Sequence, residues 1–416
     1  GGAGNDTVGE ATNGADGRDS ILGGDGADSL FAGSNNDTVY GGDGADTVDG
    51  SSGNDSIIEL NDDGADHDSL FGGAGDDFID GAQGNDLISG STGADTILGG
   101  DGDDYIADGG GSADLSDSIL GGDGADTFVG TTNSPSGDTV RGGAGADSII
   151  STATGGGNDS IIELDDDGAA DDTLAGGAGN DTLQGALGND SLFGGSGSDS
   201  ILGGDGTDWV SYANLGLANP ATVDLGAGKS TDVSGIDTLE GIENVLGGAG
   251  NDTITGGEGN DSIVGGTDTD SMVGAGGIDT FDVAGNDTVV AGAGNDVITI
   301  TATSATANIA GGDNDDTIAA GAFLATGQTI SGGSGANTLT VTVGANNATA
   351  ETVTGGTITD IQTITADFAD TTPATVDVLA LAAVTGVTTL NLTGAATGQV
   401  ATVSGLNSGA TVVNND

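Results

Sequence analysis

The commonest chemical pattern in this sequence is an aspartate at the end of a glycine-rich hexapeptide. Residues 247–264, GGAGNDTITGGEGNDSIV, hold two copies laid end to end. The glycines let the backbone turn sharply and aim its carbonyl oxygens inward, and the aspartate at position six adds a carboxylate to the same turn. Ca²⁺ takes six to eight oxygen ligands of these two kinds at about 2.3–2.6 Å, whereas Mg²⁺ demands a stricter geometry. The pattern therefore points to repeated calcium sites.

The hexapeptide recurs with a regular period. Starts at 72, 81, 90 and 99 are nine residues apart, as are starts at 176, 185, 194 and 203. The residue two positions after each aspartate is almost always apolar, as at Ile97 and Ile254. A phase this regular indicates growth by stacking of one short unit. Twelve copies fit G-G-x-G-x-D strictly, and they begin at Gly1, Gly23, Gly41, Gly72, Gly99, Gly121, Gly142, Gly176, Gly194, Gly203, Gly247 and Gly256.

A three-residue strand with one inward side chain is too short to be stable alone. Repeats eighteen residues apart can pair as parallel strands about 4.8 Å apart, with aliphatic residues inside and the turns in two columns. The sequence therefore predicts an all-β fold: a right-handed parallel β-roll (β-solenoid) with a C-terminal Thr/Val-rich β-region. Stacked carboxylates about 5 Å apart repel by roughly 1 kcal/mol per pair in water and roughly 3–4 kcal/mol at an effective dielectric constant of 20. We expect calcium between the turns to reverse that repulsion.

Charge excludes several classes of partner. The 416 residues carry 66 acidic and three basic side chains, a net charge of −63. Only seven of the acids are glutamate, and the shorter aspartate is the carboxylate that fits inside a tight turn. The chain has no basic patch for nucleic acid or an anionic membrane surface, and no run of about 18 apolar residues that could span a membrane. Its few aromatic residues are also compatible with a disordered calcium-free chain.

These units resemble the calcium-binding nonapeptides of the repeats-in-toxin (RTX) family, over most of residues 1–337. In that family each ion lies between the turns of repeats two apart, bound by turn carbonyls and the position-six aspartate. The resemblance implies multiple Ca²⁺ ions, export through a one-step (type I) secretion channel, and folding outside the cell. Two departures, GGDNDD at 311–316 and GGSGAN at 332–337, predict that calcium occupancy falls toward the end of the repeats.

The ligands that this resemblance implies are position-six aspartates and the glycines of three turns. They are Asp28, Asp46, Asp55, Asp77, Asp86, Asp95, Asp104, Asp126, Asp147, Asp159, Asp181, Asp190, Asp199, Asp208, Asp252, Asp261 and Asp270, with Gly72, Gly73, Gly75, Gly176, Gly177, Gly179, Gly194, Gly195 and Gly197.

Four segments are expected from the pattern. They are a calcium-binding β-roll at 1–211, in which 117–211 duplicates 19–107; a bridging or capping β-segment at 212–246; a second β-roll block at 247–337; and a Thr/Val-rich β-domain at 338–416. The chain begins inside a repeat, so we expect it to be part of a longer polypeptide.

Two local patterns suggest other chemistry and are interpreted differently. GAGKS at 226–230 resembles the end of a phosphate-binding loop, but Val223 stands where that motif needs its leading glycine and the surroundings are acidic. His67, in an Asp-rich insertion, is interpreted as a solvated loop residue rather than a ligand or base.

No catalytic motif is found, and no enzymatic activity is expected. The leading interpretation is an extracellular, secreted or cell-surface-associated calcium-binding structural protein, whose rigid β-roll self-associates into a bacterial surface layer or matrix, with cell-surface polysaccharide as a further partner. The C-terminal end resembles surface-layer proteins in its Thr- and Val-rich composition, and it is expected to supply assembly contacts. Two alternatives stay open: an RTX export and folding module of a secreted hydrolase or toxin, and a calcium-stiffened stalk of an adhesin.

Overall fold

The structure, a computed structural model, consists of strands, turns and bends, and its described residues include no helix. The described residues are 2–9, 17–60, 66–109, 115–130, 136–151, 156–163, 169–213, 219–301, 306–321, 327–343, 352–368, 376–393, 400–404 and 411–414.

The chain divides into two compact units. Unit 1 is Gly1–Val210 with Ser234–Ile242, and unit 2 is Ser211–Val233 with Glu243–Asp416. Residues of the expected bridging segment, 212–246, thus occur in both units. The four-part division of the chain stays a prediction.

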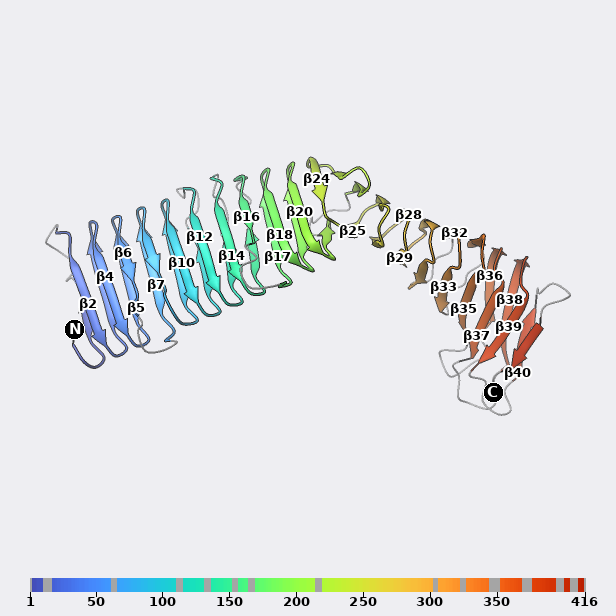
Figure 1. Cartoon of the computed structure of the whole chain (residues 1–416), viewed down its shortest axis with the longest axis horizontal. Helices are drawn as coiled ribbons and strands as arrows, with labels where there is room; N and C mark the ends of the chain where they lie inside the picture. The colour runs from blue at the N-terminus through green and yellow to red at the C-terminus, as the bar shows by residue number, and fades with distance from the viewer. Residues whose placement is uncertain are drawn as a thin grey trace. The chain divides into compact units, whose positions relative to one another are not determined.

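Unit 1 is a stack of coils in which strands of successive coils pair side by side, as the row from β2 to β20 shows (Figure 1). Every pairing described in it is parallel. One ladder contains β1 (Thr7–Gly9), β3 (Ser29–Ser34), β5 (Thr47–Ser52), β7 (Ser69–Ala74), β9 (Leu87–Thr92), β11 (Tyr105–Asp108), β13 (Thr127–Gly130), β15 (Ser148–Ser151), β17 (Thr173–Ala178), β19 (Ser191–Ser196) and β21 (Trp209–Ser211). The other contains β2 (Ser20–Asp25), β4 (Thr38–Asp43), β6 (Ser56–Ile58), β8 (Phe78–Asp80), β10 (Thr96–Asp101), β12 (Ser118–Asp123), β14 (Thr139–Ala144), β16 (Ser160–Ile162), β18 (Thr182–Gly188), β20 (Ser200–Gly206) and β24 (Ile236–Glu240).

Unit 2 repeats this arrangement, with one antiparallel hairpin, β22 (Thr222–Asp224) with β23 (Lys229–Thr231), beside its first coil. One ladder contains β25 (Asn244–Ala249), β27 (Ser262–Thr267), β29 (Thr280–Val283), β31 (Val297–Ile300), β33 (Thr317–Gly321), β35 (Thr338–Val343), β37 (Thr363–Phe368), β39 (Thr389–Thr393) and β41 (Thr411–Asn414). The other continues from β22 through β26 (Thr253–Thr255), β28 (Ser271–Gly276), β30 (Thr288–Ala293), β32 (Asn308–Asp313), β34 (Thr329–Gly333), β36 (Thr352–Thr359), β38 (Val376–Val384) and β40 (Val400–Ser404).

The core is a column of aliphatic side chains, one from each short strand. Ile97 lies opposite Ile79 on one side and Ile119 on the other, and each is at most 3% exposed. Successive residues of a strand point to opposite faces, so the Ser or Thr before each of these residues stays outside. The predicted all-β parallel solenoid, with its aliphatic interior, is confirmed.

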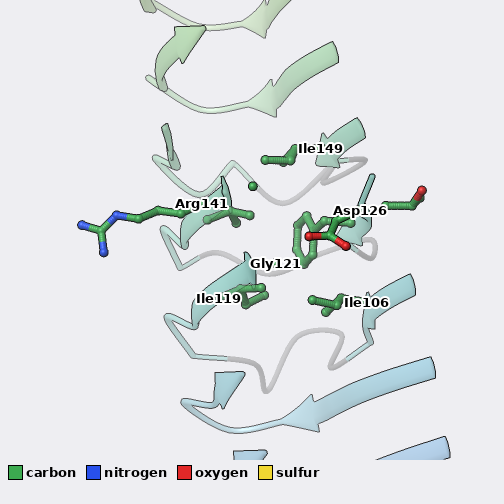
Figure 2. Close-up of a pocket in the computed structure, with 10 residues that line it drawn as sticks. Ile106, Ile119, Gly121, Asp126, Arg141 and Ile149 are labelled. Carbon is green, nitrogen blue, oxygen red and sulfur yellow. The ribbon is translucent and has the colours of Figure 1, made fainter. Parts of the chain in front are cut away.

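The interior is closely filled. A cavity of about 10 Å³ lies between coils in unit 1, and Figure 2 shows Ile106, Ile119 and Ile149 pointing toward it while the Arg141 side chain points away. A single water molecule needs about 10–15 Å³. The cavity is therefore a packing gap rather than a site for a substrate.

The Thr/Val-rich end continues the coil in its described residues. β35 pairs in parallel both with β33 of the repeat region and with β37 beyond it. Ile358, Ile364 and Leu390 carry the buried column onward. Parts of the predicted 338–416 domain lie outside the described residues, and within the described ones no helix is long and apolar enough to cross a membrane.

Candidate metal centres

The position-six aspartates stack into a hydrogen-bonded column at each set of turns, which we call the inner aspartate ladder. The backbone N–H of Asp68 donates to Oδ1 of Asp86, and the N–H of Asp86 donates to Oδ1 of Asp104, each at 2.8 Å. One column of unit 1 runs through Asp6, Asp28, Asp46, Asp68, Asp86, Asp104, Asp126, Asp147, Asp172, Asp190 and Asp208. The other runs through Asp19, Asp37, Asp55, Asp77, Asp95, Asp117, Asp138, Asp159, Asp181, Asp199 and Asp237.

Unit 2 has the same two columns. One runs from the N–H of Ala221 through Asp252, Asp270 and Asp287, and the other through Asp261, Asp279, Asp296, Asp316 and Asn337. Because each carboxylate has two oxygens, accepting the N–H of the preceding coil on Oδ1 leaves Oδ2 for another partner.

That second oxygen is buried without a protein partner in many coils. Within the described residues, Oδ2 accepts no hydrogen bond in Asp28, Asp37, Asp46, Asp55, Asp77, Asp86, Asp104, Asp126, Asp181, Asp190, Asp252, Asp270, Asp279, Asp296 and Asp316. Leaving a buried charged acceptor unsatisfied costs more than about 1–3 kcal/mol. The same defect in coil after coil indicates a ligand that the polypeptide does not supply.

The first glycine of each turn opens the space beside that oxygen. A Cβ at Gly81 would lie 2.6 Å from Oδ2 of Asp86 and 2.7 Å from the carbonyl oxygen of Gly99, in the next coil of the column. Gly247 shows the same arrangement, with Oδ2 of Asp252 at 2.5 Å. Figure 2 shows the Asp126 carboxylate near Gly121, the corresponding pair in another coil. We call this space, bounded by an aspartate Oδ2 and a carbonyl oxygen of the next coil, the cradle.

The donor set of the cradle fits calcium. It combines one carboxylate oxygen with backbone carbonyls, and Ca²⁺ accepts such mixtures in flexible geometry. In the described part of the chain, no group of three or more His, Cys, Asp or Glu side chains gathers as a metal centre made of side chains alone would require. When bound, calcium would supply the positive charge that the stacked carboxylates lack.

The remaining glycines shape the turn. Gly73, Gly75, Gly177, Gly179, Gly195 and Gly197 all have a positive φ, whereas Gly72, Gly176 and Gly194 border cradles. Every predicted aspartate lies in the described residues and in the ladder. Two of them have a further protein partner: Oδ2 of Asp261 accepts the N–H of Gly257 at 2.6 Å, and the carboxylate of Asp159 has a side-chain hydrogen bond with Ser151.

Strict matching to the hexapeptide misses aspartates that the structure brings into the same columns. They are Asp19, Asp37, Asp68, Asp117, Asp138, Asp172, Asp237, Asp279, Asp287, Asp296 and Asp316. All except Asp296 are followed by Ser or Thr and then an apolar residue, as in Asp37-Thr38-Val39. That aspartate-hydroxyl-apolar signal, read without the glycines, would have found all of them but Asp296.

A second ladder on the outside of the turns accounts for His67. The position-five side chain accepts the N–H of position five in the next coil, as Asn85 Oδ1 does from Asp103. His67 takes this place with its Nδ1, which accepts the N–H of Asn85 at 2.8 Å. The side chain is exposed, and its contact belongs to coil stacking. GAGKS forms part of the β22–β23 hairpin, where Asp224 Oδ1 accepts the N–H of Ala227.

Burial makes the ladder carboxylates reluctant to ionise without a cation. Burial, with a smaller contribution from neighbouring aspartates, raises the pKa of Asp77, Asp86 and Asp104 to about 7 and that of Asp181 to about 8, although the backbone N–H on each Oδ1 opposes the shift. The rise follows because a low-dielectric surrounding disfavours the charged form.

The calcium-free chain is therefore expected to be more stable in mild acid than at neutral pH. The raised pKa values mean that the folded chain binds more protons than the unfolded one above pH 4, so stability falls as pH rises through about 6 to 8. Thermal unfolding followed by circular dichroism, in resin-decalcified buffer at pH 5, 6.5 and 8, measures this. A melting temperature that rises from pH 5 to pH 8 would contradict it, and sedimentation at each pH excludes aggregation.

The two predicted departures near the end of the repeats behave differently. At 311–316, Asn314 adopts φ +79° in place of the fourth glycine, and Asp316 stays in the ladder with its Oδ2 in a cradle. At the next turn Asn337 keeps the ladder through Oδ1, but its Nδ2 donates to the carbonyl of Asp360 at 3.2 Å. The side-chain N–H of Asn337 thus lies in the position that the cradles of other coils leave open for a cation.

Changing Asn337→Asp is expected to add one calcium ion per chain. The substitution replaces the N–H donor by a carboxylate oxygen facing the Asp360 carbonyl, which recreates the cradle. Asp316→Asn is the matched reverse change and should remove one ion while keeping its Oδ1 hydrogen bond. Calcium content per chain after equilibrium dialysis, by atomic emission, measures both. Equal calcium content in wild type and Asn337→Asp would show that this turn does not bind the ion.

Comparison with known proteins agrees with this geometry. A family model described as the RTX calcium-binding nonapeptide repeat matches more than half of the chain, at residues 13–39, 22–57, 62–88, 81–115, 116–134, 132–162, 166–201, 184–213, 246–281 and 283–299. A search of curated proteins returns no match. The repeated cradles and the family match lead to one conclusion: this chain belongs to the RTX calcium-binding nonapeptide repeat family.

Proposed function

We propose that this chain is an extracellular structural protein whose coils are hardened by calcium and which self-associates into a bacterial surface layer or matrix. One observation carries the proposal: the inner aspartate ladder passes through successive coils of both units, so almost every coil of the repeat region is built around a cradle. A protein made chiefly of ion-dependent stacking elements is suited to rigidity rather than to turnover of a substrate. No enzymatic role is proposed.

The proposed extracellular location is supported by the calcium affinity expected of the cradles. Binding to the folded state alone stabilises by about 2.7 kcal/mol per site when free calcium is a hundredfold above Kd. Extracellular modules bind calcium with Kd of about 10⁻⁴–10⁻³ M. Cradles of that strength would be empty inside a cell and filled outside it, which supports secretion through a type I channel and folding after export. Cell-surface polysaccharide is the proposed anchor for the assembled layer.

Assembly is tested by electron microscopy and sedimentation of the purified chain in millimolar calcium, with magnesium and EGTA as controls. The proposal expects ordered sheets or a cross-linked matrix in calcium only. Folded, isolated rods in calcium would overturn self-assembly and favour an export and folding module or an adhesin stalk. A chain that shows no response to calcium would overturn the calcium role itself.

A further inference from the structure

Two glutamates take the place of a glycine in the coil. In an ordinary repeat, the fourth residue after the ladder aspartate is the first glycine of the next turn, as in Asp46-Thr47-Val48-Asp49-Gly50. In Asp55-Ser56-Ile57-Ile58-Glu59 and in its duplicate ending at Glu163, that position is glutamate. Both glutamates are buried, with 2% and 3% of their surfaces exposed. A charged side chain in so closed a place needs a partner.

Their carboxylates enter the cradle of the preceding coil. A Cβ at Gly142 would have as its nearest atoms Oδ2 of Asp147 and Oε2 of Glu163, followed by Oε1 of Glu163 at 2.6 Å. The corresponding point at Gly41 is surrounded by Oε2, Oε1 and Cδ of Glu59. In ordinary cradles this place is taken by a carbonyl oxygen, such as that of Gly99 beside Gly81. A side-chain carboxylate has replaced a backbone carbonyl.

Protein contacts hold these glutamates but satisfy only one oxygen of each. Oε2 of Glu59 accepts the N–H of Gly42 at 3.1 Å, and Oε2 of Glu163 accepts that of Gly143 at 3.2 Å. Oε1 is buried in both glutamates and accepts no hydrogen bond from the described residues. Oδ2 of Asp46, in the same turn as Gly41, is also buried without a partner. Two separate copies of the sequence thus aim an unsatisfied oxygen at the same place.

We propose that Glu59 and Glu163 are calcium ligands, each forming with the aspartate of the preceding turn a two-carboxylate site that binds calcium more tightly than the ordinary cradles. The proposal rests on the calcium function proposed above, and it adds to two of the hexapeptide turns a ligand that the hexapeptide pattern does not contain. Affinity in protein calcium sites rises with the number of charged ligands and with rigidity. The backbone N–H of each glutamate is held by the next coil, Glu59 by Asp80 and Glu163 by Gln184, so the site is rigid.

The proposal implies an order in which calcium fills the sites as its concentration rises. Calcium occupies the Glu59 and Glu163 sites first, roughly tenfold below the concentration that fills the one-carboxylate cradles. Each site bridges two successive coils, and each half of the internal duplication contains one. Two early-filled points in unit 1 would let the coils on either side stack outward from them.

Calcium binding by the full chain, measured by competition with a chromophoric chelator and by calorimetry, tests this. Wild type is expected to show a tight class of two sites, Glu59→Gln and Glu163→Gln one site each, and the double variant none, with the weaker class intact. Glu240→Gln, which removes an exposed carboxylate from β24, is the charge-matched control and should change neither class. Circular dichroism at saturating calcium reports whether each variant folds.

A second pair of variants keeps the test decisive if the glutamine variants do not fold. Glu59→Gly and Glu163→Gly restore the residue that ordinary coils carry here, so they should fold in calcium and convert a tight site into a weak one. Glutamine or glycine variants that keep both tight sites would overturn the proposal, because the glutamates would then only fill the turn. Wild type that binds calcium in a single weak class would overturn it too, whereas no binding at all would remove the calcium function with it.

Discussion

Removal of calcium is expected to unfold the repeat coils at pH 7.5 and above. Without a cation, each column of the ladder places buried carboxylates in successive coils, and the charge of Asp86 raises the pKa of Asp104 in the next coil in addition to the effect of burial. If each ion contributes about 2.7 kcal/mol, loss of six ions removes about 16 kcal/mol, which is more than the 5–15 kcal/mol by which ordinary domains are stable. The coils should therefore lose their structure cooperatively rather than fray.

Far-UV circular dichroism during EGTA titration measures this, and the fluorescence of Trp209, the only tryptophan, gives an independent signal from β21. Re-addition of calcium should restore both signals. Magnesium at the same concentration should not, because it requires near-octahedral geometry and gives up its water reluctantly. A β-signal that survives EGTA at this pH would mean that the coil does not depend on the ion.

Gly93→Ala is expected to destabilise the calcium-loaded chain by more than about 2 kcal/mol. Gly93 has φ +143°, a conformation costly for any residue with a Cβ. An added Cβ would also press on the carbonyl of Gly75 in the preceding coil, with the carbonyl carbon 2.5 Å away. The coils stack too closely there for the backbone to move aside in one coil alone.

Gly259→Ala provides the matched control, because Gly259 holds the same fourth position of a hexapeptide. Its φ lies outside the left-handed region, and the nearest atom to an added Cβ is Oδ1 of Asp261 at 3.6 Å. Chemical denaturation in saturating calcium should separate the two variants by more than about 1.5 kcal/mol. Equal stability of the two would show that position four needs glycine for a reason unrelated to coil spacing.

The coil itself could be predicted from the sequence because one aliphatic residue returns in phase with each turn. Ile97 and Ile119 fall two positions after a ladder aspartate and lie opposite each other inside the solenoid. The positions of the glycines predicted the turns less well than the aliphatic residues predicted the coil. Residues other than glycine also adopt the left-handed conformation in these turns, including Asn314 at φ +79° and Asp268 at φ +85°, so a strict glycine pattern misses working turns.

Two features of the site could not be predicted because they depend on contacts between coils. The sequence does not show that one oxygen of each aspartate binds the preceding coil while the other faces a cradle. It also does not show that the side chain of Glu59 reaches the turn of another coil. Asn337 has an amide nitrogen where aspartate would have an oxygen, and this nitrogen donates a hydrogen bond to the Asp360 carbonyl instead of leaving room for a cation. The sequence alone does not show that the Asp360 carbonyl lies there.

The central claim is that the buried Oδ2 atoms of the inner aspartate ladder are calcium ligands. Crystals of the calcium-loaded chain, measured at a long wavelength where calcium scatters anomalously, test it directly. Anomalous peaks are expected about 2.3–2.6 Å from Oδ2 of residues such as Asp77, Asp86 and Asp252, repeated along both columns. A folded coil with peaks only at outer carboxylates such as Asp43 and Asp101, or with no peaks, would contradict it.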